Sequence, residues 1–415
     1  MAWWWQRWGT GRRVARGRRR PRRAPAFFVV VMVMTGPVAC SAGQEDQRGT
    51  TSSDGPTNTA PTSPSDEPSH VKTPPSASAK PGGAECLGRS VTIVGTAGPD
   101  RLVGKPSKRE VFLTMGGDDL VTNVGGRDRV CAGGGDDRVT TKGDTGPKVD
   151  LGAGNDTFRG ATWRLIGGSG DDRLHVRGVS IVEPGAGNDL IAAKPVKDRY
   201  SAPCVSYTGV ARGIVANLTR GWVQAEDRDR VRGVQCLHGT RFADRITGSP
   251  RDDMLEVDDI YEVCTLSGSG VDRGRNIVYA GAGDDEVHGC NGGDRVYLGD
   301  GRDLFMGSKG DDWAYGGAGR DWIHGLAGSD HLEGGDGNDR VNGTFYCDTA
   351  SSAGTGMGDT SHNQVYGGNG DDEVTGDLAG DVLDGGPGVD NGYGGPPGRE
   401  GPDVIISVEE RTTCS

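Results

Sequence analysis

Apolar residues recur at every ninth position through the most regular part of the chain, residues 280–343. This spacing places a large apolar side chain at Val287, Val296, Phe305, Ile323, Leu332 and Val341. The two residues that flank each of them are mostly polar, which predicts a short strand with one side chain pointing inward. Ala314 occupies the same position with a smaller side chain, so we expect a thinner core there. No helix or ordinary strand has a period of nine, and a repeating unit of nine residues is therefore predicted.

An aspartate stands two residues before each of these apolar positions. The series without a gap is Asp285, Asp294, Asp303, Asp312, Asp321, Asp330 and Asp339. The unit, clearest in the segment "GGAGRDWIH" from Gly316, reads GGxGxDxUx with U a large apolar residue. Its glycines permit positive φ and a tight turn, and its aspartate brings a hard anionic oxygen of the kind that Ca²⁺ prefers. The pattern therefore predicts a strand preceded by a cation-binding turn.

This unit resembles the repeats-in-toxin, or haemolysin-type, calcium-binding nonapeptide. The resemblance implies an all-β fold, a parallel β-roll in which two repeats form one coil and Ca²⁺ ions lie between turns stacked one coil apart. Neighbours on one edge are then eighteen residues apart, which groups Asp285, Asp303, Asp321 and Asp339 on one edge and Asp294, Asp312 and Asp330 on the other. An acidic disordered tail, the alternative interpretation, does not explain a register that holds for seven units.

Repeats also occur outside this section. A first block, 85–192, supplies the candidate metal ligands Asp119, Asp128, Asp137, Asp156, Asp172 and Asp189. Arg109 takes the place of an aspartate, so we expect no ion in that unit. Strands such as "TWRLI" and "SIVE" are expected to lengthen the intervals after Asp137. Residues 193–279 hold a non-repeat insertion, expected to be a strand-turn-strand, and then degenerate repeats with Asp244 and Asp253.

A second insertion and a last block of repeats follow toward the end of the chain. An insertion at 344–363 precedes a last block, 364–415, with Asp372, Asp381 and Asp390 as further candidate ligands. The final segment "PDVIISVEERTTCS" has lost the pattern and is expected to cap the open edge of the solenoid.

The amino-terminal segment 1–39 predicts export. A long basic stretch precedes an apolar run of 14 residues, "AFFVVVMVMTGPVA", which is typical of a signal peptide and too short for a membrane span. The segment ends in "PVAC", which resembles a lipoprotein cleavage site with Cys40 as the lipidated residue. The alternative is a secreted protein cut near Ala39 or Ala42, and the export route stays open between the general and twin-arginine pathways. Residues 40–84 are rich in Ser, Thr and Pro and predict a disordered stalk that lifts the folded part from the outer face of the cell membrane.

Eight cysteines remain once Cys40 carries lipid, and an exported chain with eight cysteines predicts four disulfides. The simplest pairing joins neighbours in the sequence: Cys86 with Cys131, Cys204 with Cys236, Cys264 with Cys290, and Cys347 with Cys414. None of them shows the CxxC spacing of a zinc or redox site.

Composition and charge support a cation-binding solenoid. The chain of 415 residues holds 74 glycines and 33% hydrophobic residues, which argues against ordinary globular cores. Its net charge is −12, and nine arginines lie before Ala26, so the processed chain would carry −12 − 9 = −21. Such an acidic balance disfavours nucleic acid and anionic lipid as partners.

No catalytic residue is predicted. The chain contains no HExxH, GxSxG or GxxxxGK[ST] motif. The sequence therefore predicts a surface-anchored, calcium-binding structural or adhesion protein whose folding is coupled to Ca²⁺, with an extracellular protein or polysaccharide as its partner. The alternative is a calcium-dependent hydrolase or polysaccharide-modifying enzyme with its site in 193–237.

Overall fold

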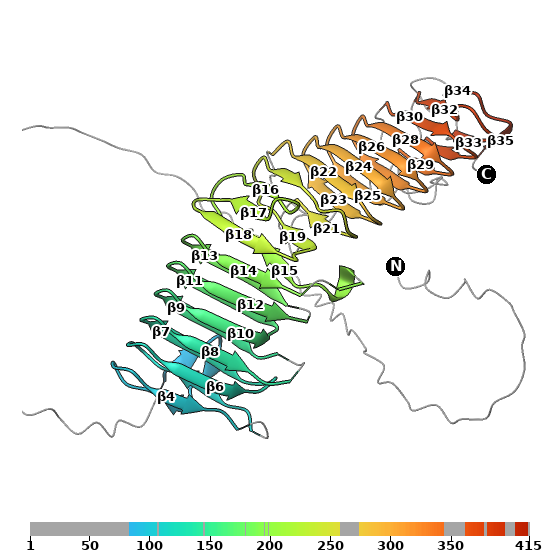
Figure 1. Cartoon of the computed structure of the whole chain (residues 1–415). Coiled ribbons are helices and arrows are strands. Elements are labelled where there is room, and N and C mark those ends of the chain that lie inside the picture. The colour runs from blue at the N-terminus through green and yellow to red at the C-terminus, as the bar shows by residue number, and fades with distance from the viewer. Residues whose placement is uncertain are drawn as a thin grey trace, which may run out of the picture. The chain divides into compact units, whose positions relative to one another are not determined.

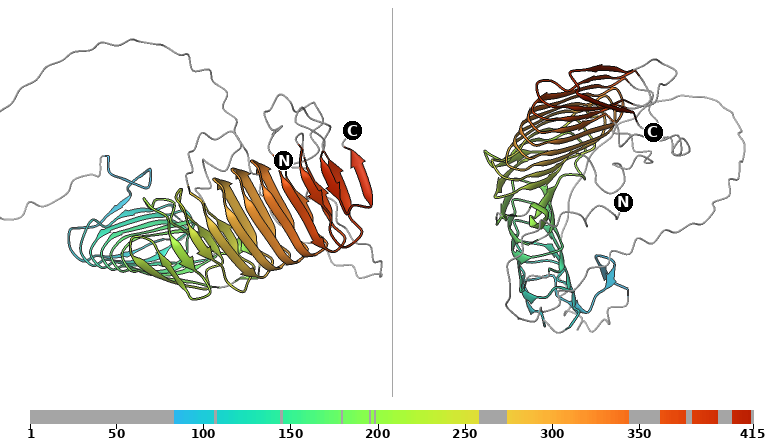
Figure 2. Two further views of the ribbon diagram at one scale, coloured as in Figure 1. Left: turned by 90° about the horizontal axis from the view of Figure 1, so that it is seen from above. Right: turned by 90° about the vertical axis from the view of Figure 1, so that its right-hand side faces the viewer.

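The computed structural model describes residues 83–105, 108–143, 146–178, 180–194, 196–197, 199–257, 274–343, 362–376, 380–394 and 403–413. Nearly all regular structure in these ranges is β, as predicted, apart from one 3-10 turn, η1 (Arg199–Ser201). The strands stack as successive rungs of a solenoid with two parallel faces, sheet I and sheet II (Figures 1 and 2).

Sheet I is parallel throughout. Its strands, in spatial order, are β3 (Ile93–Val94), β5 (Val111–Leu113), β7 (Arg129–Gly134), β9 (Lys148–Ala153), β11 (Arg164–Ser169), β13 (Ile181–Ala186), β15 (Cys204–Ser206), β19 (Cys236–His238), β21 (Met254–Glu256), β23 (Glu286–Asn291), β25 (Leu304–Lys309), β27 (Trp322–Ala327), β29 (Arg340–Asn342), β31 (Glu373–Thr375), β33 (Asn391–Gly394) and β35 (Glu410–Thr413).

Sheet II is parallel except around one hairpin. Its strands, in order of pairing, are β4 (Arg101–Val103), β6 (Leu120–Val124), β8 (Arg138–Thr141), β10 (Thr157–Ala161), β12 (Arg173–Arg177), β14 (Leu190–Ala193), β18 (Arg228–Arg232), β17 (Trp222–Gln224), β16 (Val215–Asn217), β20 (Arg245–Thr247), β22 (Ile277–Ala282), β24 (Arg295–Gly301), β26 (Trp313–Gly319), β28 (His331–Gly337), β30 (Gln364–Asn369), β32 (Val382–Asp384) and β34 (Val404–Ile406).

The pairing register confirms the coil of two repeats. Phe305 in β25 pairs with Val287 in β23 on one side and with Ile323 in β27 on the other, each eighteen positions away. All three side chains are fully buried between the sheets, and so is Ala314. The core is therefore a narrow column of one or two apolar side chains from each strand.

The long intervals after Asp137 contain whole strands, as expected. Asp156, Asp172 and Asp189 directly precede β10, β12 and β14, which are neighbours in sheet II. Each interval is thus one whole coil, and the turn on the other edge of that coil carries no aspartate of the repeat. The strands expected at "TWRLI" and "SIVE" are confirmed as β11 and β13, and each is the sheet I strand of its coil.

The insertion after residue 193 continues both sheets. In sheet II, β14 pairs directly with β18, while in sheet I, β15 pairs with β19. The antiparallel pair β16 and β17, with Val215 opposite Gln224, is the strand-turn-strand expected in this segment. The solenoid therefore accommodates the insertion as one enlarged coil.

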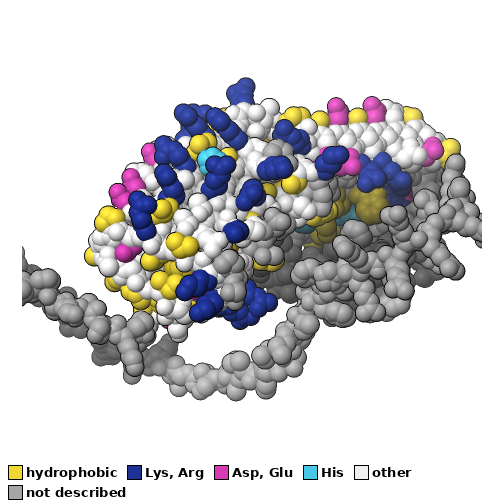
Figure 3. All heavy atoms as spheres, turned by 60° about the horizontal axis from the view of Figure 1, so that its bottom comes forward, with side chains coloured by type: hydrophobic (Ala, Val, Ile, Leu, Met, Phe, Trp, Pro, Cys, Tyr) yellow, Lys and Arg dark blue, Asp and Glu magenta, His cyan; other side chains and the backbone are white. Residues whose placement is uncertain are grey.

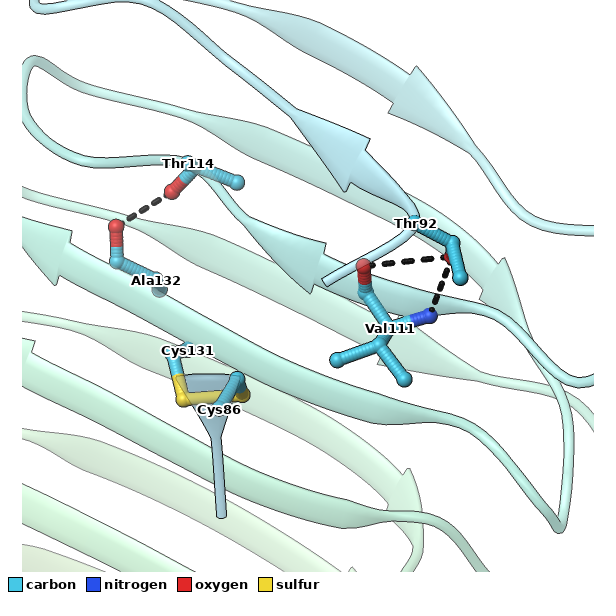
Figure 4. Close-up of a disulfide and its surroundings, with 6 residues drawn as sticks. All are labelled: Cys86, Thr92, Val111, Thr114, Cys131 and Ala132. Carbon is cyan, nitrogen blue, oxygen red and sulfur yellow. Dashed lines mark hydrogen bonds between the residues drawn. A yellow bond between two sulfur atoms is a disulfide. The ribbon is translucent and has the colours of Figure 1, made fainter. Parts of the chain in front are cut away.

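Two of the four expected disulfides lie within the described ranges and are confirmed. Cys86–Cys131 ties the hairpin of β1 (Glu85–Cys86) and β2 (Arg89–Ser90) to β7, with 5.8 Å between Cα atoms (Figure 4). Cys204–Cys236 joins the neighbouring strands β15 and β19 across 4.4 Å. Cys290 is also disulfide-bonded, whereas Cys264, Cys347 and Cys414 lie outside the described residues.

The ends of the described part differ in how they finish the sheets. At the carboxyl end, β34 and β35 pair with β32 and β33 and so add one more coil in place of a separate cap. The predicted signal peptide, Cys40, the stalk up to residue 82 and most of the 344–363 insertion lie outside the described residues. In the ranges that are described, no helix is long and apolar enough to cross a membrane.

We expect Phe305→Ala to lower the free energy of unfolding of the calcium-loaded protein by about 3 to 5 kcal/mol, because it opens a cavity in the column between the sheets. Met306→Ala is the matched control, since Met306 points outward from the same strand and is only partly buried. Urea unfolding of both variants in calcium measures the difference. Equal losses in the two variants would contradict the assignment of Phe305 to the core.

Candidate calcium-binding turns

Each of the predicted metal ligands lies in a turn and directly precedes a strand. All are buried, with side chains at most 3% exposed: Asp119, Asp128, Asp137, Asp156, Asp172, Asp189, Asp244, Asp253, Asp285, Asp294, Asp303, Asp312, Asp321, Asp330, Asp339, Asp372, Asp381 and Asp390. The structure therefore places these carboxylates at the two edges of the solenoid, between the sheets and below the surface.

Hydrogen bonds join the aspartates of one edge into a ladder. The backbone N–H of Asp303 donates to Oδ1 of Asp321 at 2.9 Å, and the N–H of Asp321 donates to Oδ1 of Asp339 at 2.8 Å. On the other edge, the N–H of Asp294 donates to Oδ1 of Asp312 at 2.8 Å. Each aspartate thus satisfies a buried donor in the coil before it. The predicted division of the seven regular aspartates between two edges agrees with these ladders.

The ladders contain members that counting aspartates at period nine does not find. Buried Asn276 and Asn363 take aspartate positions on one edge, and each accepts the same type of bond at its side-chain oxygen. Asp229 continues the series after Asp189 across the enlarged coil. A search for aspartate alone misses the two asparagines, although their side-chain oxygens accept the same bond. Asp229 is missed because it lies 40 residues after Asp189, far outside the period of nine.

One unit is shifted by a residue from the sequence interpretation. Glu110, not Arg109, occupies the ladder position before β5, because the N–H of Glu110 donates to Oδ1 of Asp128 at 2.9 Å. The Glu110 carboxylate in turn accepts the N–H of Lys105 at 2.6 Å.

The second carboxylate oxygen sets many of these aspartates apart. Within the described residues, Oδ2 is buried and accepts no hydrogen bond in Asp119, Asp137, Asp156, Asp172, Asp189, Asp312, Asp321, Asp339, Asp372 and Asp390. A buried polar atom without a partner is unfavourable by about 1 to 3 kcal/mol, and more when it carries charge. A row of such oxygens therefore needs a cation or protons.

Glycine makes these turns possible for two reasons, which the turn before Asp321 illustrates. Gly317 and Gly319 have φ of +112° and +143°, where a side chain is strained. A Cβ on either glycine would also collide with the carbonyl oxygen of Gly299 or Gly301 in the coil before. Successive turns are thus in direct backbone contact, with the aspartates held against them.

Burial raises the pKa of several ladder carboxyls. It raises the pKa of Asp321 to about 7 and that of Asp312 to about 8, and in both the neighbouring aspartates of the same edge raise it further. Asp189, in the amino-terminal block, has a pKa raised to about 8 by burial and then by Asp229 and Asp172. The ladder without a cation therefore favours protonated carboxyls near neutral pH.

A second group of turns is closed by hydrogen bonds. In Asp244 and Asp253, Oδ2 accepts the N–H of the Thr240 or Ser249 that stands four residues earlier, and the hydroxyl donates to Oδ1. Oδ2 of Asp128 accepts the N–H of Gly125 at 2.7 Å. Both carboxylate oxygens of these three residues already have donors, because the residue at the start of the turn directs its N–H toward the carboxylate.

A further row of oxygens lies on the exposed side of the turns, one residue before the ladder. Asp136 donates its N–H to Oδ1 of Asp118 at 2.9 Å, and Asn155 donates to Asp136 at 2.8 Å. These bonds run from the later coil to the earlier one, opposite to the buried ladder. The paired aspartates of the repeat thus have structural roles on both sides of the turn.

One cluster of metal-ligating residue types lies in the enlarged coil. Cys204, Cys236 and His238 approach one another, but the two sulfurs form a disulfide and are not thiolates. Burial lowers the pKa of His238 to about 4, so its ring is neutral beside Glu256, 3.5 Å away. The disulfide accounts for this cluster, and no metal is assigned to it.

The open turns fit calcium. Their donors are carboxylate and backbone oxygens, the oxygens are buried and the turns are stacked, as a hard cation with many oxygen ligands requires. The family model of the RTX calcium-binding nonapeptide repeat matches residues 271–305, 306–341 and 357–395. No curated protein matches the chain. The regular section thus carries RTX repeats, and its resemblance to this calcium-binding family is confirmed.

We expect Asp321→Asn to weaken calcium binding on its own edge by roughly tenfold or more, because the amide keeps an acceptor for Asp303 while removing the charge. Isothermal titration calorimetry with Ca²⁺ measures this loss. Asp300→Asn is the matched control, since Asp300 is exposed in the turn that stacks beneath and loses the same charge. An equal effect in both variants would show that net charge alone acts.

In chelator, we expect the unfolding midpoint to fall as the pH rises from about 6.5 to about 8.5. The folded pKa values of Asp312, Asp321 and Asp372 lie above those of an unfolded chain, at about 8, 7 and 7. Their contribution to stability is complete below the unfolded pKa and is lost as the pH rises through the folded pKa. Thermal unfolding followed by circular dichroism tests this, and a rising midpoint would contradict it.

Proposed function

Because residues 271–341 and 357–395 match the RTX repeat, we propose that this protein is a calcium-loaded β-roll whose ions are held by the open turns of both edges. The observation that supports this best is the row of buried Oδ2 atoms without a hydrogen bond. When bound, calcium supplies positive charge to these oxygens. The chain's own residues provide the rest: glycines bring the turns together, and the ladder bonds orient each carboxylate.

The proposed ions are distributed unevenly along the solenoid. Open turns at both ends of the described part flank a stretch closed by Asp244 and Asp253. We assign no ion to these two turns or to the one of Asp128, which revises the sequence expectation. The seven aspartates from Asp285 to Asp339 stay proposed calcium ligands, as predicted from the sequence, since all of them join the ladders of RTX repeats.

Calcium binding is proposed to be coupled to folding. Each coil buries a narrow apolar strip, and the carboxylates stacked at its edges oppose burial while they carry charge. At about 2 mM calcium, a site with a dissociation constant near 10⁻⁴ M adds about 1.8 kcal/mol of stability. Several such sites together would decide whether the regular section folds.

The protein is proposed to act outside the cell, attached by lipid at Cys40 and raised on the stalk of residues 40–84. The support for this lies in the sequence, since both segments lie outside the described residues apart from the last two positions of the stalk. The described part of the chain presents a long, repetitive surface. Such a surface suits a structural or adhesion role better than it suits catalysis at a single concave site.

We propose that the chain has no catalytic activity of its own. The segment 193–237, where an enzyme site was the alternative, supplies strands β15 to β18 and part of β19 to the two sheets. Its cysteines are joined in a disulfide, which leaves them without nucleophilic thiols. This placement supports a structural role for the segment.

Hydrogen exchange followed by mass spectrometry, with and without chelator, tests the coupling. We expect chelation to increase amide exchange strongly in 313–332, where open turns lie, and only slightly in 236–255, where the turns are closed and Cys236 is bonded to Cys204. Magnesium is the control cation, because its smaller octahedral shell suits such turns poorly. Exchange that does not respond to chelator, with no calcium bound in calorimetry, would refute the proposed function.

A further inference from the structure

The outer face of sheet II carries an array of arginines. Their side chains stand at outward strand positions and all are exposed: Arg101, Arg138, Arg159, Arg173, Arg177, Arg228, Arg230, Arg232, Arg245 and Arg295. We call this set the arginine face. Figure 3 shows many Lys and Arg side chains gathered on one face of the molecule, with Asp and Glu mostly at its margins.

The charges of the protein are separated in space. Between β4 and β26, the exposed strand positions of sheet II hold one acidic residue, Asp300, which lies near the turn at the end of β24, and the next outward acidic residue is Glu333 in β28. The acidic residues of the repeat lie instead in the turns at the edges. The net charge of −12 therefore does not describe this face, and the expectation that it repels polyanions applies to the edges.

The arginine face has no acidic partners in the part of the chain that the structure describes. Among the described residues, no acidic side chain forms an ion pair with any of its members. On sheet I, by contrast, Arg164 pairs with Glu183 at 2.7 Å and Arg340 with Glu373 at 2.9 Å. The guanidinium groups of sheet II are thus available to an external anion.

The register gives these charges a regular spacing. Arg101, Arg138, Arg173 and Arg230 lie in one row across sheet II, separated in turn by Leu120, Thr157 and Leu190. One arginine on every second strand corresponds to a spacing of about 9.5 Å along the solenoid. A linear polymer with repeating anionic groups matches such a row better than a compact anion does.

Aromatic rings on the same sheet decide which polymer fits best. Arg228 covers the ring of Trp222 at 4.8 Å, and Arg295 covers that of Trp313 at 4.9 Å. Tyr279 and Tyr297 stack on each other, with 5.0 Å between their centroids. At least one face of each of these rings is therefore covered and closed to a nucleic-acid base, while the guanidinium N–H groups remain to bind carboxylate or sulfate in pairs of hydrogen bonds.

We infer that the arginine face binds a linear polysaccharide that carries carboxylate or sulfate groups. This deepens the adhesion part of the proposed function and rests on it, while it does not depend on how many calcium ions are bound. The strand positions fix the guanidinium groups on a rigid sheet, so binding costs little ordering of the protein.

The test is binding of the purified protein, in millimolar calcium, to immobilised hyaluronan and dextran sulfate, with neutral dextran as the blank. We expect binding to both anionic polymers that weakens with salt, and an affinity lower by about tenfold in the double variant Arg138→Gln with Arg173→Gln. The matched control is the double variant Lys148→Gln with Lys309→Gln. Both lysines are exposed elsewhere on the solenoid, so these substitutions remove the same total charge, and we expect the affinity to change by less than about twofold.

Four outcomes would overturn the inference: no binding, an equal loss in both double variants, tighter binding to poly(dT), or tighter binding to phosphatidylglycerol vesicles. Calcium titration of the same samples separates this result from the proposed function. Polysaccharide binding without bound calcium would refute the calcium role and leave the arginine face standing. Normal calcium binding with no polysaccharide binding would refute the arginine face alone.

Discussion

The structure depends on carboxylates that are buried beside one another. An aspartate such as Asp321 satisfies a backbone donor of the coil before it with one oxygen and holds the other in a site without a donor. The first interaction orients the turn, and the second makes the turn unfavourable unless a proton or a cation is present. Fold and ion requirement therefore arise from the same side chain, and the narrow apolar column between the sheets cannot be considered apart from them.

The regular section was predictable because each unit satisfies several requirements at once. Contact between the backbones of stacked turns requires glycine, the ladder of hydrogen bonds requires aspartate, and the core between the sheets requires an apolar residue. Residues 280–343 therefore show a strict period of nine. Where one requirement relaxes, the pattern fades although the coil persists. Asn276 keeps the ladder bond without the charge, and the coils that contain Asp156, Asp172 and Asp189 have an aspartate on one edge only.

Other features could not be predicted because they depend on direction in space. Asp244 and Asp253 fit the period, yet their turns are closed by a local N–H whose orientation only the folded backbone fixes. Likewise, the net charge of the chain does not reveal that the acidic residues lie at the edges and the arginines on the outer face of sheet II. That separation arises because alternate strand positions point to opposite sides of a sheet. The pairing of cysteines that are neighbours in the sequence succeeded for Cys86 with Cys131 and Cys204 with Cys236, since a solenoid brings successive coils into contact.

The buried ladders have a polarity along the chain. Each coil obtains the acceptor for its turn N–H from a coil that follows it in the sequence, as Asp372 does from Asp390. A chain that leaves a membrane channel with its amino end first would thus always expose one incomplete coil until the next coil emerges. The acceptor for the last buried aspartate of this edge is Glu409, whose carboxylate accepts the N–H of Asp390 at 2.7 Å. In such a chain the segment around Glu409 would complete the last coil, which would give a sequence without repeats a role in the order of folding.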